Sequence, residues 1–218
     1  MFSAVLFDLD GTLLDTLDDL ADSMNEVLAP RGAPVHERAA YRRFIGDGLE
    51  MLVRRALPED QNDDATVVAC MEAMRERYAE RWDRRSRPYP GVPGLLDALV
   101  ERGVRLAVLS NKPHDFTCRM VERMLARWRF DPVLGSRPGV PRKPDPQVAR
   151  AIAEQHGVAP SGWLYLGDTP IDVKTARAAG MTAVGATWGF RDAAELEEAG
   201  ARHLIDHPRQ LLELLDPE

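Results

Sequence analysis

The sequence predicts a doubly wound α/β fold, in which helices cover both faces of a mostly parallel sheet and an all-helical domain is inserted after the first strand. From residue 88 onward, short apolar runs alternate with segments of helical periodicity, which is typical of a parallel sheet. Between residues 35 and 87 the sequence contains no strand pattern. We therefore expect a core domain of residues 1–14 and 88–218 and a helical cap domain of residues 15–87.

The first strand is expected in the short apolar run that begins at Ala4 and ends on Asp8 and Asp10. Gly11 and Thr12 then indicate a turn. In the inserted block, apolar residues recur with helical spacing, which predicts helices over residues 15–28, 38–45, 49–57 and 65–82.

A Pro- and Gly-rich segment, residues 87–94, marks the return to the sheet. Beyond it, helical spacing with glycine at several C-terminal ends predicts helices at 95–103, 114–128, 147–156, 172–179 and 208–215. Apolar runs between these helices predict strands at 104–109, 132–134, 163–166, 182–185 and 203–205.

Composition excludes several classes of protein. The chain has 218 residues and a formal net charge of −7, which argues against non-specific binding to nucleic acid or to an anionic membrane. The sequence shows no apolar run of membrane-spanning length and no basic segment followed by an apolar core, so we expect no signal peptide. Cys70 and Cys118 lack metal or redox spacing, which favours free, buried thiols in the cytoplasm. We expect a monomer or a homodimer.

Asp8 and Asp10 form a carboxylate pair at the end of the first strand. Residues i and i+2 of an extended chain point to the same face. Two like charges so close require a cation between them or a proton on one of them. One could be a nucleophile and the other an acid/base, and both could help to hold Mg²⁺; an ordinary turn with a helix cap is the alternative.

Other polar side chains follow later strands. They are Ser110 and Asn111, Lys143 in a loop before a helix, and Asp168 with Asp172. Parallel strands end at one edge of the sheet, so we expect these groups to converge on the carboxylate pair. Each alone is explained by a turn, a cap or a solvated loop. Together they suit phosphoryl transfer, which needs a nucleophile, donors for phosphate oxygens and a divalent cation.

The segments that carry these side chains resemble the four motifs of haloacid dehalogenase-superfamily phosphatases. They are D-L-D-G-T at 8–12, L-S-N at 109–111, R-K-P-D-P at 142–146 and G-D-T-P-I-D at 167–172. The resemblance implies a Rossmann-like sheet, and the helical insert is similar to the superfamily's type 1 cap.

The resemblance also implies roles for the candidate residues. Asp8 would be the nucleophile that forms an aspartyl-phosphate, and Asp10 would be the general acid/base, with its backbone carbonyl on the cation. The phosphoryl oxygens would be held by Ser110, Asn111 and Lys143, and Mg²⁺ would be held by Asp8, Asp10, Asp168 and Asp172.

Residue types that are absent narrow the reaction. Asp10 favours phosphoryl transfer over dehalogenation, in which no alkoxide must be protonated. The block 15–87 has no lysine, so a cap lysine for phosphonate cleavage is missing. The His and Lys that mutase relatives carry after the first motif are also missing. Hydrolysis is favoured; a sugar-phosphate phosphomutase, a pyrophosphatase of the same fold or a non-catalytic regulatory protein are the alternatives.

Residues 15–25, 44–48 and 110–113 resemble phosphoglycolate phosphatases. This likeness favours a small phosphorylated metabolite as the substrate. The glycines of the loop at Gly46 and Gly48 would let the backbone approach a small ligand closely. Arg43 or Arg55 could then meet the carboxylate of 2-phosphoglycolate, although either could equally solvate a helix surface.

Overall fold

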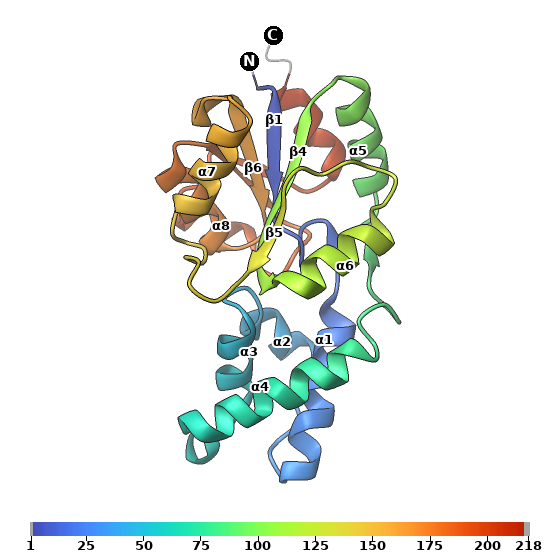
Figure 1. Cartoon of the computed structure of the whole chain (residues 1–218), viewed down its shortest axis with the longest axis vertical. Coiled ribbons are helices and arrows are strands. Elements are labelled where there is room, and N and C mark those ends of the chain that lie inside the picture. The colour runs from blue at the N-terminus through green and yellow to red at the C-terminus, as the bar shows by residue number, and fades with distance from the viewer. Residues whose placement is uncertain (1, 216–218) are drawn as a thin grey trace. The chain divides into compact units, whose positions relative to one another are not determined.

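The computed structural model describes residues 2–215 and divides into two compact units. One unit contains the chain up to Leu14 and from Pro88 onward, and the other contains Asp15–Arg87. The first unit is a sheet with helices on both sides of it (Figure 1). The described elements of the second unit are helices, apart from one strand residue at each of its ends.

The main sheet has six strands in the order β5-β4-β1-β6-β7-β8, and every pairing is parallel. This confirms the predicted α/β class. The strands are β1 (Ala4–Phe7), β4 (Arg105–Pro113), β5 (Val133–Ser136), β6 (Trp163–Gly167), β7 (Thr182–Ala186) and β8 (His203–Ile205).

Strand β1 lies between β4 and β6 at the centre of the sheet. Phe7 is in register with Val108 of β4 and with Leu166 of β6, so residues that follow these three positions reach the same edge. The neighbours of β1 on its two sides, β4 and β6, both come from later parts of the chain. In open α/β sheets, ligands bind outside the C-terminal strand ends at a position of this kind.

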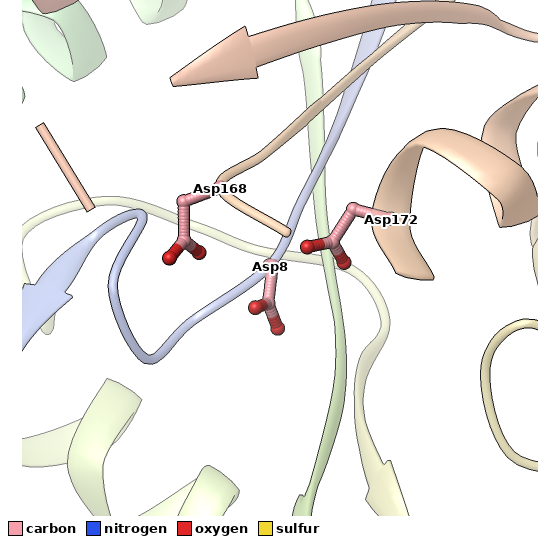
Figure 2. A group of neighbouring side chains, drawn as sticks. All are labelled: Asp8, Asp168 and Asp172. Carbon is pink, nitrogen blue, oxygen red and sulfur yellow. The ribbon is translucent and has the colours of Figure 1, made fainter. Parts of the chain in front are cut away.

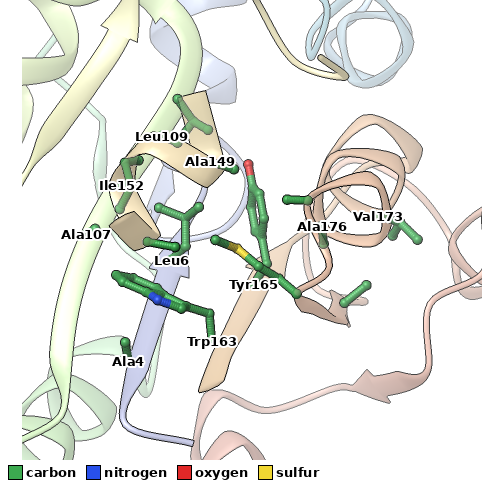
Figure 3. Close-up of a cluster of buried hydrophobic side chains, with 14 of the residues drawn as sticks. Ala4, Leu6, Ala107, Leu109, Ala149, Ile152, Trp163, Tyr165, Val173 and Ala176 are labelled. Atoms are coloured by element: carbon green, nitrogen blue, oxygen red, sulfur yellow. The ribbon is translucent and has the colours of Figure 1, made fainter. Parts of the chain in front are cut away.

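The strands are apolar because both sheet faces are covered. One face packs on α7 (Gln147–Gln155), α8 (Pro170–Ala179) and α9 (Ala193–Glu198), as Figure 3 shows in part. Alternate strand residues supply this cluster, including Ala4 and Leu6 from β1. Val5 and Phe7, on the opposite face, are also fully buried.

The remaining helices of the sheet unit are α5 (Val92–Glu101), α6 (His114–Met124) and the 3₁₀ helices η3 (Pro160–Gly162) and η4 (Pro208–Leu214). Some predicted bounds were wrong. The segment 208–215 forms a 3₁₀ helix rather than an α-helix, and the helix predicted at 114–128 ends at Met124. Helix α9 was not predicted; its Asp192 N-cap accepts the Glu195 N–H at 3.0 Å.

One correction affects the site. The strand predicted at 104–109 continues to Pro113, so Ser110, Asn111 and Lys112 are strand residues rather than a loop after the strand. All three are buried. The strand can extend because β5 continues alongside it, with Pro113 in register with Ser136 after a shift in pairing.

The helical unit contains α1 (Leu17–Leu28), α2 (Arg38–Phe44), α3 (Leu49–Ala56) and α4 (Asp64–Ala79), with 3₁₀ turns η1 (Ala29–Arg31) and η2 (Glu59–Gln61). Its two ends are tied by the buried Asp19. One carboxylate oxygen of Asp19 accepts hydrogen bonds from the Arg85 N–H, the Ser86 N–H and the Ser86 hydroxyl, at 2.8–3.0 Å.

Two-residue strands, β2 (Leu14–Asp15) and β3 (Arg87–Pro88), pair as a separate sheet where the chain passes between the units. None of the helices within residues 2–215 combines the length and the apolar character needed to cross a membrane.

Candidate active site

Three buried carboxylates meet at the edge where β1 and β6 end (Figure 2). Asp8 directly follows β1, Asp168 directly follows β6, and Asp172 lies in the first turn of α8. One oxygen of each lies within 4.8 Å of the others. The structure thus brings together the first and last of the acidic segments singled out in the sequence, as the parallel strand order requires.

Lys143 lies against this group. Its Nζ is 2.8 Å from Asp8 Oδ1 and 2.7 Å from Asp172 Oδ1, and its side chain is only 2% exposed. Burial lowers the pKa of Lys143, but Asp172 and Asp8 outweigh this and raise that pKa well above its usual value. Lys143 is therefore a fixed positive charge beside the two carboxylates.

Asp8 is not fully satisfied by this ion pair. Apart from the ion pair with Lys143 at 2.8 Å, the buried Asp8 Oδ1 has no hydrogen-bond partner among the described residues. Burial raises the pKa of Asp8 to about 7, since the attraction of Lys143 is opposed by the nearby Asp172. Additional positive charge at this oxygen would favour the ionised form of Asp8.

Asp168 is held from two directions that the sequence did not indicate. The Thr12 hydroxyl donates to Oδ1 and the Phe190 N–H donates to Oδ2, each at 2.8 Å. Glycine is required beside it, because a Cβ at Gly11 or Gly189 would lie 2.3 Å from Asp168 atoms. Burial, followed by repulsion from Asp8, raises the pKa of Asp168 well above its usual range.

Asp172 has both oxygens engaged. Oδ2 accepts the Thr169 N–H and hydroxyl at 3.1 and 2.7 Å and closes a capping box on α8, while Oδ1 accepts from Lys143 Nζ. Asp172 therefore holds the Lys143 ammonium as well as the start of α8.

The polar residues of β4 adjoin the same site. The Asn111 side chain accepts the Lys143 N–H at 3.0 Å and donates to the Lys143 carbonyl at 3.1 Å. It therefore clamps the loop that carries the lysine to β4. Ser110 is buried one residue earlier, and its hydroxyl accepts the Lys112 N–H at 3.3 Å.

Asp10 has a partner that sequence reasoning missed. The Nζ of Lys112 lies 3.1 and 3.0 Å from the two carboxylate oxygens of Asp10. The Asp10 side chain is not part of the three-carboxylate group found in the described residues. Because β4 extends to Pro113, Lys112 lies at this edge of the sheet, beside the end of β1.

The cap candidates lie in the helical unit. Gly46 and Gly48 both have positive φ, +124° and +92°, on either side of Asp47. Arg55 pairs with Asp47 at 2.5 Å and donates to the carbonyls of Arg43 and Phe44 at 3.3 and 3.2 Å. Arg55 thus holds the 44–48 loop in shape, while Arg43 is exposed in α2.

The donor set fits a hard divalent cation. Carboxylate oxygens are the ligands that Mg²⁺ prefers, and, apart from its ion pair with Lys143, the buried Asp8 Oδ1 has no hydrogen-bond partner among residues 2–215. The raised pKa values of Asp8 and Asp168 have the same largest cause, burial of the carboxylates, and repulsion from neighbouring carboxylates adds to it. A cation here would reduce that repulsion.

Comparisons with known proteins identify the family of this chain. The sequence profile of the haloacid dehalogenase-like hydrolases matches residues 5–186. A phosphoglycolate phosphatase of Pseudomonas putida is 34% identical over 212 residues, which cover 95% of this chain and 78% of that protein. One of Rhodospirillum rubrum is 36% identical over 196 residues, 87% of this chain and 81% of that protein.

The fold has a similarly close counterpart. A crystal structure from Lactobacillus delbrueckii subsp. bulgaricus, of a protein with the provisional name phosphoglycolate phosphatase, superposes with a TM-score of 0.92. It is 30% identical, and the match covers 100% of this chain and 99% of that one. On the sequence profile and the extent of these matches, the chain belongs to the haloacid dehalogenase-like hydrolases.

Proposed function

We propose that this protein is a Mg²⁺-dependent phosphatase that hydrolyses 2-phosphoglycolate or a closely similar small phosphomonoester. The observation that carries the proposal is the group of Asp8, Asp168 and Asp172 at the end of β1, with Lys143 paired to Asp8 and Asp172. The substrate is supported by the relatives named phosphoglycolate phosphatase, which align with nearly the whole chain.

Asp8, Asp168 and the backbone carbonyl of Asp10 are the proposed ligands of Mg²⁺. The ion would reduce the repulsion between an anionic nucleophile and an anionic substrate. Asp172 stands beside these ligands and holds Lys143, which it contacts at 2.7 Å.

In the first step, a carboxylate oxygen of Asp8 attacks phosphorus and an aspartyl-phosphate forms as the P–O bond to the alcohol breaks. Asp10 gives a proton to the departing alkoxide oxygen. Lys143, the Ser110 hydroxyl and the Asn111 N–H stabilise the phosphoryl oxygens, whose charge must be met by preorganised donors.

In the second step, Asp10 takes a proton from water as the water oxygen attacks phosphorus. The bond between Asp8 and phosphorus breaks, so inorganic phosphate leaves and Asp8 returns to its carboxylate form. A single residue, Leu9, thus separates the nucleophile from the group that moves the proton, and each of the two carboxylates has its own lysine partner.

We further propose that the helical unit, residues 15–87, acts as the cap that admits the substrate. The loop at Gly46 and Gly48 is its candidate substrate-facing segment. A cytoplasmic location is supported by two free cysteines, of which Cys70 is buried and Cys118 half-buried. A monomer and a homodimer both remain compatible with the proposal.

The test is release of inorganic phosphate by the purified chain, with Mg²⁺ or with EDTA. The panel includes 2-phosphoglycolate, pyrophosphate, sugar phosphates and p-nitrophenyl phosphate. We expect Mg²⁺-dependent turnover that is fastest with 2-phosphoglycolate. Isomerised sugar phosphate without free phosphate would indicate a mutase, and folded protein that turns over none of the panel would favour a regulatory role.

A further inference from the structure

Lys112 and Asp10 form a buried ion pair next to the nucleophile. The Lys112 Nζ contacts both oxygens of Asp10, at 3.0 and 3.1 Å, and the two side chains are 4% and 11% exposed. A surface ion pair can form and dissolve freely, but a buried ammonium needs a defined anionic partner. Its position at the edge of the sheet therefore calls for a functional explanation.

Lys112 and Lys143 are the two cationic side chains that are buried among residues 2–215. Lys143 forms ion pairs with Asp8 and Asp172. Lys112 is the buried positive charge assigned to Asp10, the residue proposed to protonate the leaving oxygen. The two lysines thus divide the site into a phosphoryl side and a leaving-group side.

The leaving-group side has a specific requirement if the substrate is 2-phosphoglycolate. The leaving alcohol then carries a carboxylate, whose carbon is two bonds from the ester oxygen, a span of about 2.4 Å. A residue that donates to the ester oxygen must therefore stand close to that carboxylate. A cation in contact with this residue is near enough to bind the carboxylate.

We propose that Lys112 is a specificity-determining residue, which binds the carboxylate of the substrate while it holds Asp10 in place. This rests on the proposed phosphatase function. A lysine ammonium is a compact charge with three rotatable donors, so one N–H group can bind an arriving carboxylate while another stays on Asp10.

The arginines suggested from the sequence are weaker candidates for this task. Arg55 is engaged with Asp47 and with two backbone carbonyls of its own unit. Arg43 is an exposed residue of α2. Lys112, by contrast, is built into the sheet next to the reacting groups.

The test compares two esters that differ in the proposed recognition group. 2-Phosphoglycolate and 2-hydroxyethyl phosphate each have a CH₂ after the ester oxygen, followed by a carboxylate in one and a neutral CH₂OH in the other. The readout is the ratio of their kcat/KM values, with KM and kcat determined separately. The wild type should favour 2-phosphoglycolate.

Lys112→Met should reduce this ratio about 100-fold, mostly through KM for 2-phosphoglycolate, because a charged partner is lost in a buried site. Lys112→Arg, which keeps the charge, should retain most of the preference. Lys174→Met removes an exposed lysine of α8 and should leave both esters unaffected. If Lys112→Met does not fold, Lys112→Gln can still donate to Asp10 and should show the same fall.

Equal losses on both esters would overturn the proposal, because they would mean that Lys112 only positions Asp10. A wild type without preference for the carboxylate ester would overturn it too. Failure of the proposed function gives a different result, namely no Mg²⁺-dependent phosphate release from 2-phosphoglycolate by the wild type.

Discussion

The ion pairs of the sheet unit and those of the helical unit use the same residue types in opposite surroundings. Lys143 and Asp172 are each 2% exposed. In the helical unit, Arg85 and Asp22 also pair, but their side chains are 47% and 39% exposed, and Arg81 joins the same carboxylate at 3.2 Å.

This difference in burial changes what an ion pair contributes to the stability of the protein. Exposed pairs contribute about 0–1 kcal/mol each, because water and salt already screen the charges. For a buried pair, the free energy lost by removing the charges from water can exceed the free energy gained by their attraction. Apolar residues of similar size would often give the fold equal stability. Under the proposed function, the buried charges of the sheet unit are needed by the reaction, whereas the exposed charges of the helical unit can be exchanged.

The largest expected effect is the loss of the nucleophile. Asp8→Asn keeps the size of the side chain but removes the attacking carboxylate, so kcat for 2-phosphoglycolate should fall by at least about 10⁴-fold. Asp22→Asn, the matched change in an exposed pair, should leave kcat within about twofold. Both variants should unfold cooperatively; an Asp8→Asn enzyme of near-normal activity would refute the assignment.

Removal of Lys143 should affect both activity and stability. Lys143→Met leaves Asp8 and Asp172 without their shared cation, which should reduce the free energy of unfolding by about 3–5 kcal/mol and kcat by about 10³-fold. Arg85→Met should reduce the free energy of unfolding by under about 1 kcal/mol. Urea unfolding of the metal-free proteins measures the two losses in the free energy of unfolding. Equal losses for Lys143→Met and Arg85→Met would contradict the expected difference between buried and exposed ion pairs.

The acid role of Asp10 predicts a dependence on the leaving group. Asp10→Asn should reduce kcat for 2-phosphoglycolate by about 10²–10³-fold. p-Nitrophenyl phosphate should lose much less, since its leaving oxygen needs little protonation. Equal losses on the two substrates would indicate that Asp10 does not deliver the proton.

The raised pKa of Asp8 predicts how Mg²⁺ binding depends on pH. In the metal-free fold, burial raises the pKa of Asp8 from 3.8 to about 7, so below pH 7 a proton must leave before the cation binds. The affinity for Mg²⁺ should therefore rise by up to about tenfold per pH unit as pH approaches 7, and Asp168, whose pKa is also raised, should add to this rise. Calorimetric titration at pH 6, 7 and 8 measures this.

Stability should respond in the opposite sense when the metal is absent. Between pH 3.8 and about 7 the folded state binds the proton of Asp8 more tightly than the unfolded state does, so unfolding becomes easier as pH rises through this window. Mg²⁺ should offset that loss. A metal-free stability that increases across the window would contradict the assigned pKa shift.

Much of the site was predictable, because the pattern of apolar residues in the sequence locates whole strands. Asp8 and Asp168 each follow an apolar run, and parallel pairing brings the ends of β1 and β6 to one edge. The same reasoning placed Lys143 near them, although its clamp by Asn111 depends on side-chain geometry that spacing does not encode.

Lys112 was missed for a different reason. Proline at 113 and polar residues from 110 suggested that the strand had ended, whereas pairing with β5 carries β4 to Pro113. One signal could have found it: Lys112 is among only three lysines in the chain, and it directly follows a motif. The supports of Asp168 from Thr12 and Phe190 lie too far apart in sequence for any local pattern to reveal.

The hydrogen bonds of Asp19, which join the two ends of the helical unit, have a consequence for how such proteins diversify. Because Asp19 binds the Arg85 and Ser86 backbone, the insert starts and finishes at neighbouring points on its own surface. A module with adjoining ends can be grafted into a loop without stretching the host. We therefore expect that a different insert with similarly adjoining ends could replace residues 15–87 without displacing the buried carboxylates that follow β1 and β6.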